Sequence, residues 1–186
     1  MELIKFLLSI LVLYIILVLF IISSLLYLSP IVSNHTKAVD IPITAKDAQE
    51  VYRNLNIYTG FTYAGRIPLR IVENTEVNAY TDGKEVVLYS GMLNYVESKD
   101  ELAAVLAHEV AHAVLEHVYT KMMFEQSVLE GNADKFAIYL MLRAGYDVCQ
   151  AKNLWLKLRD DGGDYEYNSD HPNYSYRIWQ FDFPQC

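Results

Sequence analysis

SKDELAAVLAHEVAHAVLEH, residues 98–117, is the stretch that decides the fold of this chain. It opens with a predicted capping box, in which the hydroxyl of Ser98 and the carboxylate of Glu101 satisfy free amides at a helix start. A helix is predicted over residues 100–119, with apolar side chains on one of its sides. Because apolar residues flank and separate the histidines of this helix, we expect the face that carries them to be buried.

His108, Glu109 and His112 fit the pattern H-E-x-x-H on this helix. Histidines four residues apart lie on one helix face, about 6 Å from each other, so both imidazoles can reach one metal ion. Glu109 lies one residue round from His108, where it can take a proton from water and pass it to a leaving amine. The alternative is a helix with two ordinary histidines. Zinc is favoured because two buried histidines beside a carboxylate need a partner.

A catalytic zinc requires a third protein ligand and one open position. The metzincin pattern, which places a glycine and a third histidine after His112, is excluded because those positions hold Leu115 and Val118. His117 is predicted to point elsewhere, as a surface or helix-end residue. Glu116 would stack one turn further on, but a third ligand from the same helix would strain a tetrahedral site.

Glu130 is the better candidate for the third ligand. It follows His112 by 18 residues, which leaves room for a turn and an antiparallel helix, predicted over residues 128–143 and ended by Gly145. Asp134 lies one turn further along the same face, where it can accept a hydrogen bond from a ligating imidazole and fix its orientation. A solvated acidic face is the alternative for both acids, and the neighbouring H-E-x-x-H disfavours it.

The remaining pattern predicts an α+β domain that is mainly helical and contains a small antiparallel sheet. Asp82-Gly83 predicts a type I′ hairpin turn between the last two strands. The other predicted elements are a helix over residues 44–60 that is capped by Thr44 and stopped by Gly60, strands over residues 68–72, 77–80 and 85–89, and a helix over residues 149–159.

Residues 6–28 form an apolar run without a single charge. A helix of this length covers a hydrocarbon core of about 30 Å, and a helix without a polar face is not expected in water. A cleavable signal peptide has an apolar region of about 7–15 residues, followed by an A-x-A-like cleavage site. Residues 6–28 are longer than this and no such site follows them, so a signal peptide is disfavoured. We therefore predict a single-pass membrane anchor at residues 1–29, a tether at 30–43 and one domain at 44–186.

Charge and cysteine usage limit the compartment and the partners. The net charge is −8 and no basic run occurs, so nucleic acid is excluded as an expected partner. Cys149 and Cys186 are far apart and form no C-x-x-C pair; whether they form a disulfide is open. Lysines on both sides of the apolar run hardly discriminate its orientation. A short cytoplasmic N-terminus and the two cysteines favour an extracytoplasmic, periplasmic domain.

Four motifs in a fixed order carry a resemblance: residues 77–80, residues 98–117, EGNADKFA from Glu130 and SDHPNYSYRI from Ser169. On these motifs the chain resembles the HtpX-like zinc metallopeptidases, a family that includes CAAX prenyl proteases and mitochondrial and periplasmic quality-control peptidases. The resemblance covers roughly residues 68–178. It implies a zincin-like fold, one zinc ion per chain and protein or peptide substrates.

The resemblance also implies roles for individual residues. Zinc would be bound by His108, His112 and Glu130, with Glu109 as the general base and Asp134 behind the ligands. Asn78 and Ala79 would lie on a strand that binds the peptide by β-pairing. His171 would face the active site as a donor to the developing oxyanion, and Arg177 matches the family's arginine six residues further on.

Two features set the expected function. HtpX-type members have several membrane spans, whereas one is predicted here, so prenylated substrates are not indicated. We expect a membrane-anchored endopeptidase in protein quality control. The alternative is a chaperone-like or binding protein that keeps the fold, and the intact Glu109 argues against it. A structural zinc domain is disfavoured because such sites close all four ligand positions.

Overall fold

The structure is a computed structural model that describes residues 42–60, 67–162, 174–180 and 186. All of these residues belong to one compact unit, Asp40–Cys186. The predicted anchor at residues 6–28 lies outside the described residues. Within the described residues, no helix combines the length and the apolar character that crossing a membrane would require.

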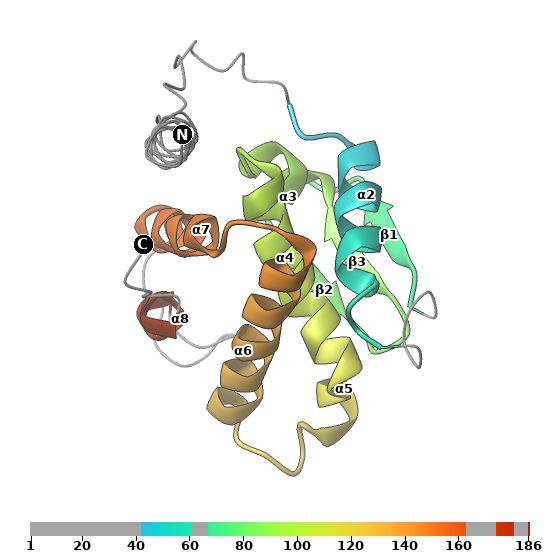
Figure 1. Cartoon of the computed structure of the whole chain (residues 1–186), viewed down its shortest axis with the longest axis vertical. Helices are drawn as coiled ribbons and strands as arrows, with labels where there is room; N and C mark the ends of the chain where they lie inside the picture. The colour runs from blue at the N-terminus through green and yellow to red at the C-terminus, as the bar shows by residue number, and fades with distance from the viewer. Residues whose placement is uncertain (1–41, 61–66, 163–173, 181–185) are drawn as a thin grey trace, which may run out of the picture. The chain divides into compact units, whose positions relative to one another are not determined.

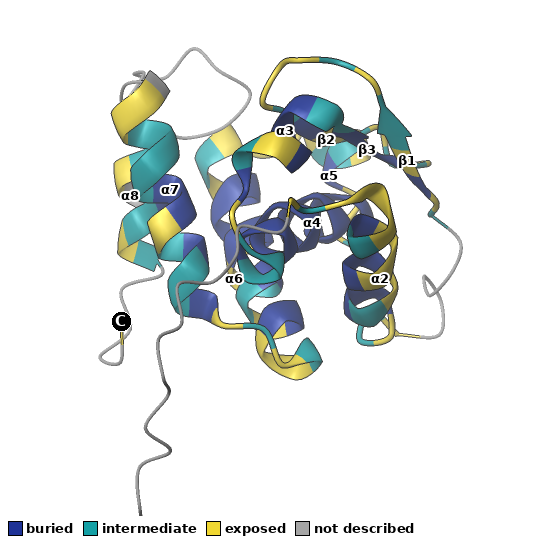
Figure 2. Ribbon diagram, turned by 90° about the horizontal axis from the view of Figure 1, so that it is seen from above, coloured by how far each residue is buried: buried dark blue, intermediate teal, exposed yellow. Residues whose placement is uncertain are grey.

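The central element is helix α4 (Lys99–Val114), which is buried along nearly its whole length. Every residue from Glu101 to Ala113 is buried, as Figure 2 shows. A helix with apolar side chains on all sides must be covered on all sides. It is covered by α2 (Ala45–Asn56), α6 (Gln126–Ala144), α7 (Val148–Gly162) and the sheet, as Figures 1 and 2 show.

Both predicted helix starts are confirmed by their caps. Thr44 and Asp47 form a complete capping box at the start of α2. At α4 the hydroxyl of Ser98 accepts a hydrogen bond from the backbone N–H of Glu101 at 3.1 Å. The carboxylate of Glu101 accepts from the backbone N–H of Glu97 at 2.8 Å, so its partner is one residue earlier than a capping box would place it.

The sheet is mixed, and the prediction of an antiparallel sheet was wrong for one pair. The strand order is β1-β3-β2, with β1 (Leu69–Val72) parallel and β2 (Ala79–Thr81) antiparallel to β3 (Val86–Tyr89). Because β1 and β2 lie on opposite edges, the connection between them must cross the end of β3. It passes over Gly91, where a Cβ would collide with the backbone carbonyl oxygens of Thr75 and Glu76.

The predicted hairpin between β2 and β3 is present, but its turn is not of type I′. Thr81 pairs with Val86, so the loop consists of residues 82–85. Gly83 has a φ of 82°, and Asp82 does not have the positive φ that type I′ requires. The side-chain oxygen of Asp82 instead accepts hydrogen bonds from the backbone N–H groups of residues 84 and 85, at 2.8 and 2.9 Å, which closes a longer turn.

The helix predicted over residues 100–119 is interrupted. It ends at Leu115, and Glu116 adopts the left-handed conformation, with a φ of 57°, before the short helix α5 (His117–Thr120) begins. By contrast, α6 ends where predicted, with Gly145 as its left-handed cap at a φ of 81°. The predicted helix over residues 149–159 is α7. The helices α3 (Ser90–Tyr95) and α8 (Tyr174–Gln180) were not predicted.

The two cysteines form a disulfide between Cys149 and Cys186, which settles the question that the sequence left open. The bridge joins the first turn of α7 to the last residue of the chain. The segment that it closes, 37 residues in sequence separation, contains α8. Cross-linking a segment of this length stabilises a fold by about 3–4 kcal/mol, mainly by restricting the unfolded chain.

Candidate metal centre

Three side chains from two helices converge in the interior. His108 and His112 project from α4, and Glu130 projects from the first turns of α6, which lies beside α4 (Figure 1). The Nε2 atoms of the two histidines are 3.0 Å apart. The carboxylate oxygens of Glu130 lie 3.2 Å from His108 Nε2 and 3.4 Å from His112 Nε2.

This arrangement fits a tetrahedral metal ion. Ligand atoms at zinc distances on one face of a tetrahedron are separated by about 3.3 Å. The observed separations are close to that value: 3.0 Å between the two Nε2 atoms, 3.2 Å from His108 Nε2 to Oε2 of Glu130 and 3.4 Å from His112 Nε2 to Oε1 of Glu130. Two imidazole nitrogens and one carboxylate oxygen are also a donor set that zinc uses in catalytic sites. The described residues therefore contain a site that can hold one zinc ion: His108, His112 and Glu130.

A buried ion pair supports His108 from behind. Asp134 Oδ1 lies 2.9 Å from His108 Nδ1 and accepts a hydrogen bond from the guanidinium of Arg177, also at 2.9 Å. The same guanidinium nitrogen is 2.9 Å from His108 Nδ1, and the guanidinium stacks on the ring of Trp155. We assign the proton of His108 to Nδ1, which donates to Asp134, because this assignment leaves the lone pair of Nε2 for the metal.

The protonation of this cluster follows from burial and from its charges. Burial raises the pKa of Asp134, but the Arg177 guanidinium and the hydrogen bond with His108 outweigh it and lower that pKa to about 2. Burial and Arg177 lower the pKa of His108, whereas hydrogen bonds with Asp134 and Glu130 outweigh them and raise it to about 9. The pKa of His112, by contrast, is lowered by burial.

Two of the three candidate ligands, His112 and Glu130, border an open cleft of about 550 Å³. One wall is formed by residues 78–81 of β2 and the segment before it, and the other by Glu109, His112 and Glu130. Asn78 and Ala79 therefore lie across the cleft from the histidine helix. In the described sheet β3 is the middle strand, and β2 is an edge strand that pairs with β3 along one of its sides.

The structure brings most of the predicted site residues together. His108, Glu109, His112, Glu130, Asp134 and Arg177 are all buried around the site, and Asn78 and Ala79 line its cleft. His171 lies outside the described residues.

The prediction for His117 was wrong, because its side chain is buried and its Nδ1 lies 3.0 Å from Nδ1 of His112. The interruption at Glu116 turns His117 back toward the site. No local signal in the sequence announces this turn, since glutamate rarely adopts the left-handed conformation.

Comparisons with known proteins agree with this site. Residues 42–130 match the model of Peptidase family M48. The chain is 28% identical to a mitochondrial metalloendopeptidase OMA1 of Arabidopsis thaliana over 138 residues, which cover 55% of the chain and 28% of that protein. It is 27% identical to OMA1 of Schizosaccharomyces pombe over 148 residues, covering 59% of the chain and 44% of the relative.

A shorter match is to the beta-barrel assembly-enhancing protease of Yersinia pestis. It is 39% identical over 57 residues, which cover 30% of the chain and 12% of that protein. The chain thus spans less than half the length of each of these relatives. Peptidases of this family use zinc, and the donor set of His108, His112 and Glu130 fits that metal.

Replacing Asp134 by asparagine tests the support behind the ligands. We expect Asp134→Asn to weaken zinc binding about 10–100-fold, because an uncharged amide oxygen replaces the carboxylate as the partner of His108 and holds its ring less firmly. Loss of one partner of a buried ion pair also lowers the free energy of unfolding by about 3–5 kcal/mol. Zinc affinity is measured by competition with a chelator, and unfolding in urea. The matched control is Asp160→Asn, whose carboxylate pairs with Arg159 at the surface. Unchanged zinc affinity in a folded Asp134→Asn chain would contradict the assignment.

Proposed function

We propose that this chain, whose residues 42–130 match the model of Peptidase family M48, is a zinc-dependent endopeptidase that cuts polypeptides in the cleft between β2 and α4. One observation carries the proposal: a buried cluster that can hold a metal ion reaches an open cleft through His112 and Glu130, and Glu109 lines the same cleft. A purely structural metal site would not need the open cleft or the additional carboxylate.

Glu109 is the residue to which we assign proton transfer. It follows His108 on α4 and lines the cleft together with His112. From this position its carboxylate takes a proton from the attacking water and passes it to the amine that leaves. Zinc, when bound by His108, His112 and Glu130, supplies Lewis acidity for the attack on the scissile carbonyl.

The edge of β2 is the proposed binding site for the peptide backbone. Asn78 and Ala79, with the two residues that follow them, form the cleft wall opposite Glu109. A peptide in extended conformation can add to such an edge through backbone hydrogen bonds, which bind without regard to sequence. This mode suits an enzyme that acts on many unfolded chains, and we propose protein quality control as its role.

His171 and Arg177 are assigned different parts. We propose that His171, on the evidence of the sequence motif, donates a hydrogen bond to the developing oxyanion. Arg177 is buried between Asp134 and Trp155, so we propose that it positions His108 through Asp134 and does not touch substrate.

Exchange of the proposed base tests the function. We expect Glu109→Gln to lower kcat for cleavage of an unfolded protein by about 10²–10⁴-fold, because the reaction loses its general base, and to retain one zinc ion per chain. The full chain is loaded with zinc and cleavage is followed by electrophoresis. Glu125→Gln, an exposed glutamate at the start of α6, serves as the control. Equal cleavage by both variants would contradict the role of Glu109. A zinc-loaded parent chain that binds unfolded protein without cutting it would indicate the chaperone-like alternative.

We also propose that residues 6–28 anchor the chain in a membrane and that the domain lies on an extracytoplasmic side. The uncharged run supports the anchor, and the disulfide supports an oxidising compartment. Carbonate-washed membranes from expressing cells should retain the chain, and a thiol-reactive polyethylene glycol should label its cysteines only after reduction. Release by carbonate would contradict the anchor, and labelling without reduction would contradict the compartment.

A further inference from the structure

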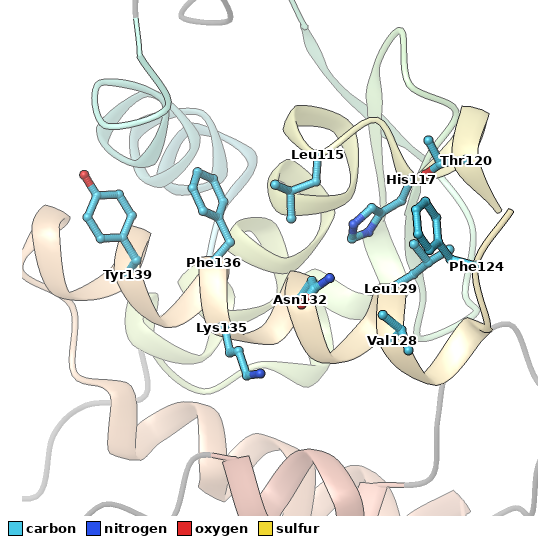
Figure 3. Close-up of a pocket in the computed structure, with 10 residues that line it drawn as sticks. All are labelled: Leu115, His117, Thr120, Phe124, Val128, Leu129, Asn132, Lys135, Phe136 and Tyr139. Carbon is cyan, nitrogen blue, oxygen red and sulfur yellow. The ribbon is translucent and has the colours of Figure 1, made fainter.

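A second hollow lies beside the catalytic cleft. It is an apolar groove of about 520 Å³ along α6, shown in Figure 3. Phe136 and Tyr139 lie at one end of the groove and Phe124 at the other, with Leu115 on the facing side. The residues just before Phe124 add to the apolar surface, because Met122 is 91% and Met123 77% exposed.

The groove adjoins the catalytic cleft. His117 and Leu129 line both hollows, so they form the partition between them. Exposed apolar surface of this kind marks an interaction site in a soluble domain.

We infer that the groove binds an apolar stretch of the substrate polypeptide, several residues from the bond that is cut. Apolar side chains of the substrate would pack against Phe124, Val128 and Phe136. Thr120, Asn132 and Lys135 add hydrogen-bonding groups to the same groove, which suit a polypeptide backbone and have no counterpart in a lipid tail. The inference rests on the proposed function, since it extends the path of the same substrate.

The groove makes apolar character the basis of substrate selection. Backbone pairing along β2 accepts any extended sequence, whereas a groove lined by aromatic and aliphatic side chains favours apolar ones. Folded proteins keep such stretches buried, and unfolded ones expose them. The enzyme would therefore cut unfolded chains in preference to folded ones.

The test compares three quenched-fluorescence peptides that share one cleavable core. The first is the core alone, the second carries apolar extensions at both ends, and the third carries serine-glycine extensions of the same length. The full chain is used in lipid nanodiscs, which keep detergent out of the groove. The groove variant is Phe124→Ser combined with Tyr139→Ser, two partly exposed positions, and the control is Ile57→Ser, an exposed apolar residue on the C-terminal side of α2.

We expect the apolar extensions to lower KM about tenfold with the parent chain, the equivalent of burying one apolar side chain. The groove variant should lose this advantage without a change in kcat for the core peptide. Equal KM values for the apolar and polar extensions, or an unaffected groove variant, would overturn the inference. The groove variant could instead leave KM unaltered and change self-association or membrane retention. That result would assign the groove to another occupant and would also overturn the inference.

Binding of the same peptides to the Glu109→Gln chain separates this inference from the proposed function. Fluorescence anisotropy reports binding without cleavage. If the parent chain cuts none of the peptides, the proposed function fails. The groove inference is then decided by binding alone. It is supported if the apolar extensions increase affinity and the groove variant abolishes this increase, and it is contradicted otherwise.

A different observation carries a second inference, which concerns His117. The Nδ1 atoms of His117 and His112 are 3.0 Å apart, and both rings are buried. With Nε2 of His112 directed at the metal position, its Nδ1 carries the proton and donates it to Nδ1 of His117. We propose that His117 is a positioning residue, which fixes the ring of His112 as Asp134 fixes that of His108.

Replacement of the acceptor tests this proposal through zinc affinity in the full chain. His117→Asn keeps an acceptor, because the amide oxygen can take the place of Nδ1, whereas His117→Leu keeps much of the volume without one. We expect the leucine variant to bind zinc about 10–100-fold more weakly and the asparagine variant to retain most of the affinity. His117→Ala replaces the leucine variant if that one does not fold. Equal affinities of the variants with and without an acceptor would overturn the proposal.

Discussion

A cluster of ionisable groups inside the most buried helix is the constraint on which this fold depends. Helix α4 is buried from Glu101 to Ala113, yet it carries two histidines and a glutamate near the end of this stretch. Groups of this kind are stable in the interior only when each is paired. The partners come from α6, which supplies Glu130 and Asp134, and from α8, which supplies Arg177. Removing one member of such a buried pair costs about 3–5 kcal/mol, a large part of the roughly 5–15 kcal/mol that holds a domain folded. The pairing of the site residues therefore contributes to the stability of the fold as well as to the geometry of the site.

The sequence predicted the part of the site that follows from helix geometry. His108 and His112 share a face because they are four residues apart, and Glu130 and Asp134 do so for the same reason. The distance from His112 to Glu130 allowed one turn between two antiparallel helices, and this is how α4 and α6 are connected apart from the short α5. Glycine at the end of α6 and the N-cap residues Thr44 of α2 and Ser98 of α4 are equally local signals, and each was predicted correctly.

The features that escaped prediction depend on contacts between distant segments or on an unusual backbone. The parallel placement of β1 depends on the crossing at Gly91, which no strand pattern reveals. The role of Arg177 depends on α8, a helix of seven residues that is held by the contacts of Arg177 with Asp134 and Trp155. His117 escaped because the helix was expected to continue through Glu116. Five residues along a regular helix correspond to a rotation of about 140°, which would have taken His117 away from the metal face.

The left-handed backbone of Glu116, with a φ of 57°, affects both the metal site and the groove. A residue other than glycine pays about 1–2 kcal/mol in this conformation, so the surrounding structure must hold it there. Two features depend on the turn that it makes. It brings His117 against His112, and it redirects the chain so that α5 and the residues up to Phe124 flank both the catalytic cleft and the apolar groove. A straight helix would have neither the contact nor this boundary. Backbone strain at a site is retained when the geometry that it produces is used, and here one strained residue links the orientation of a proposed metal ligand to the surface along which we propose that substrate is bound.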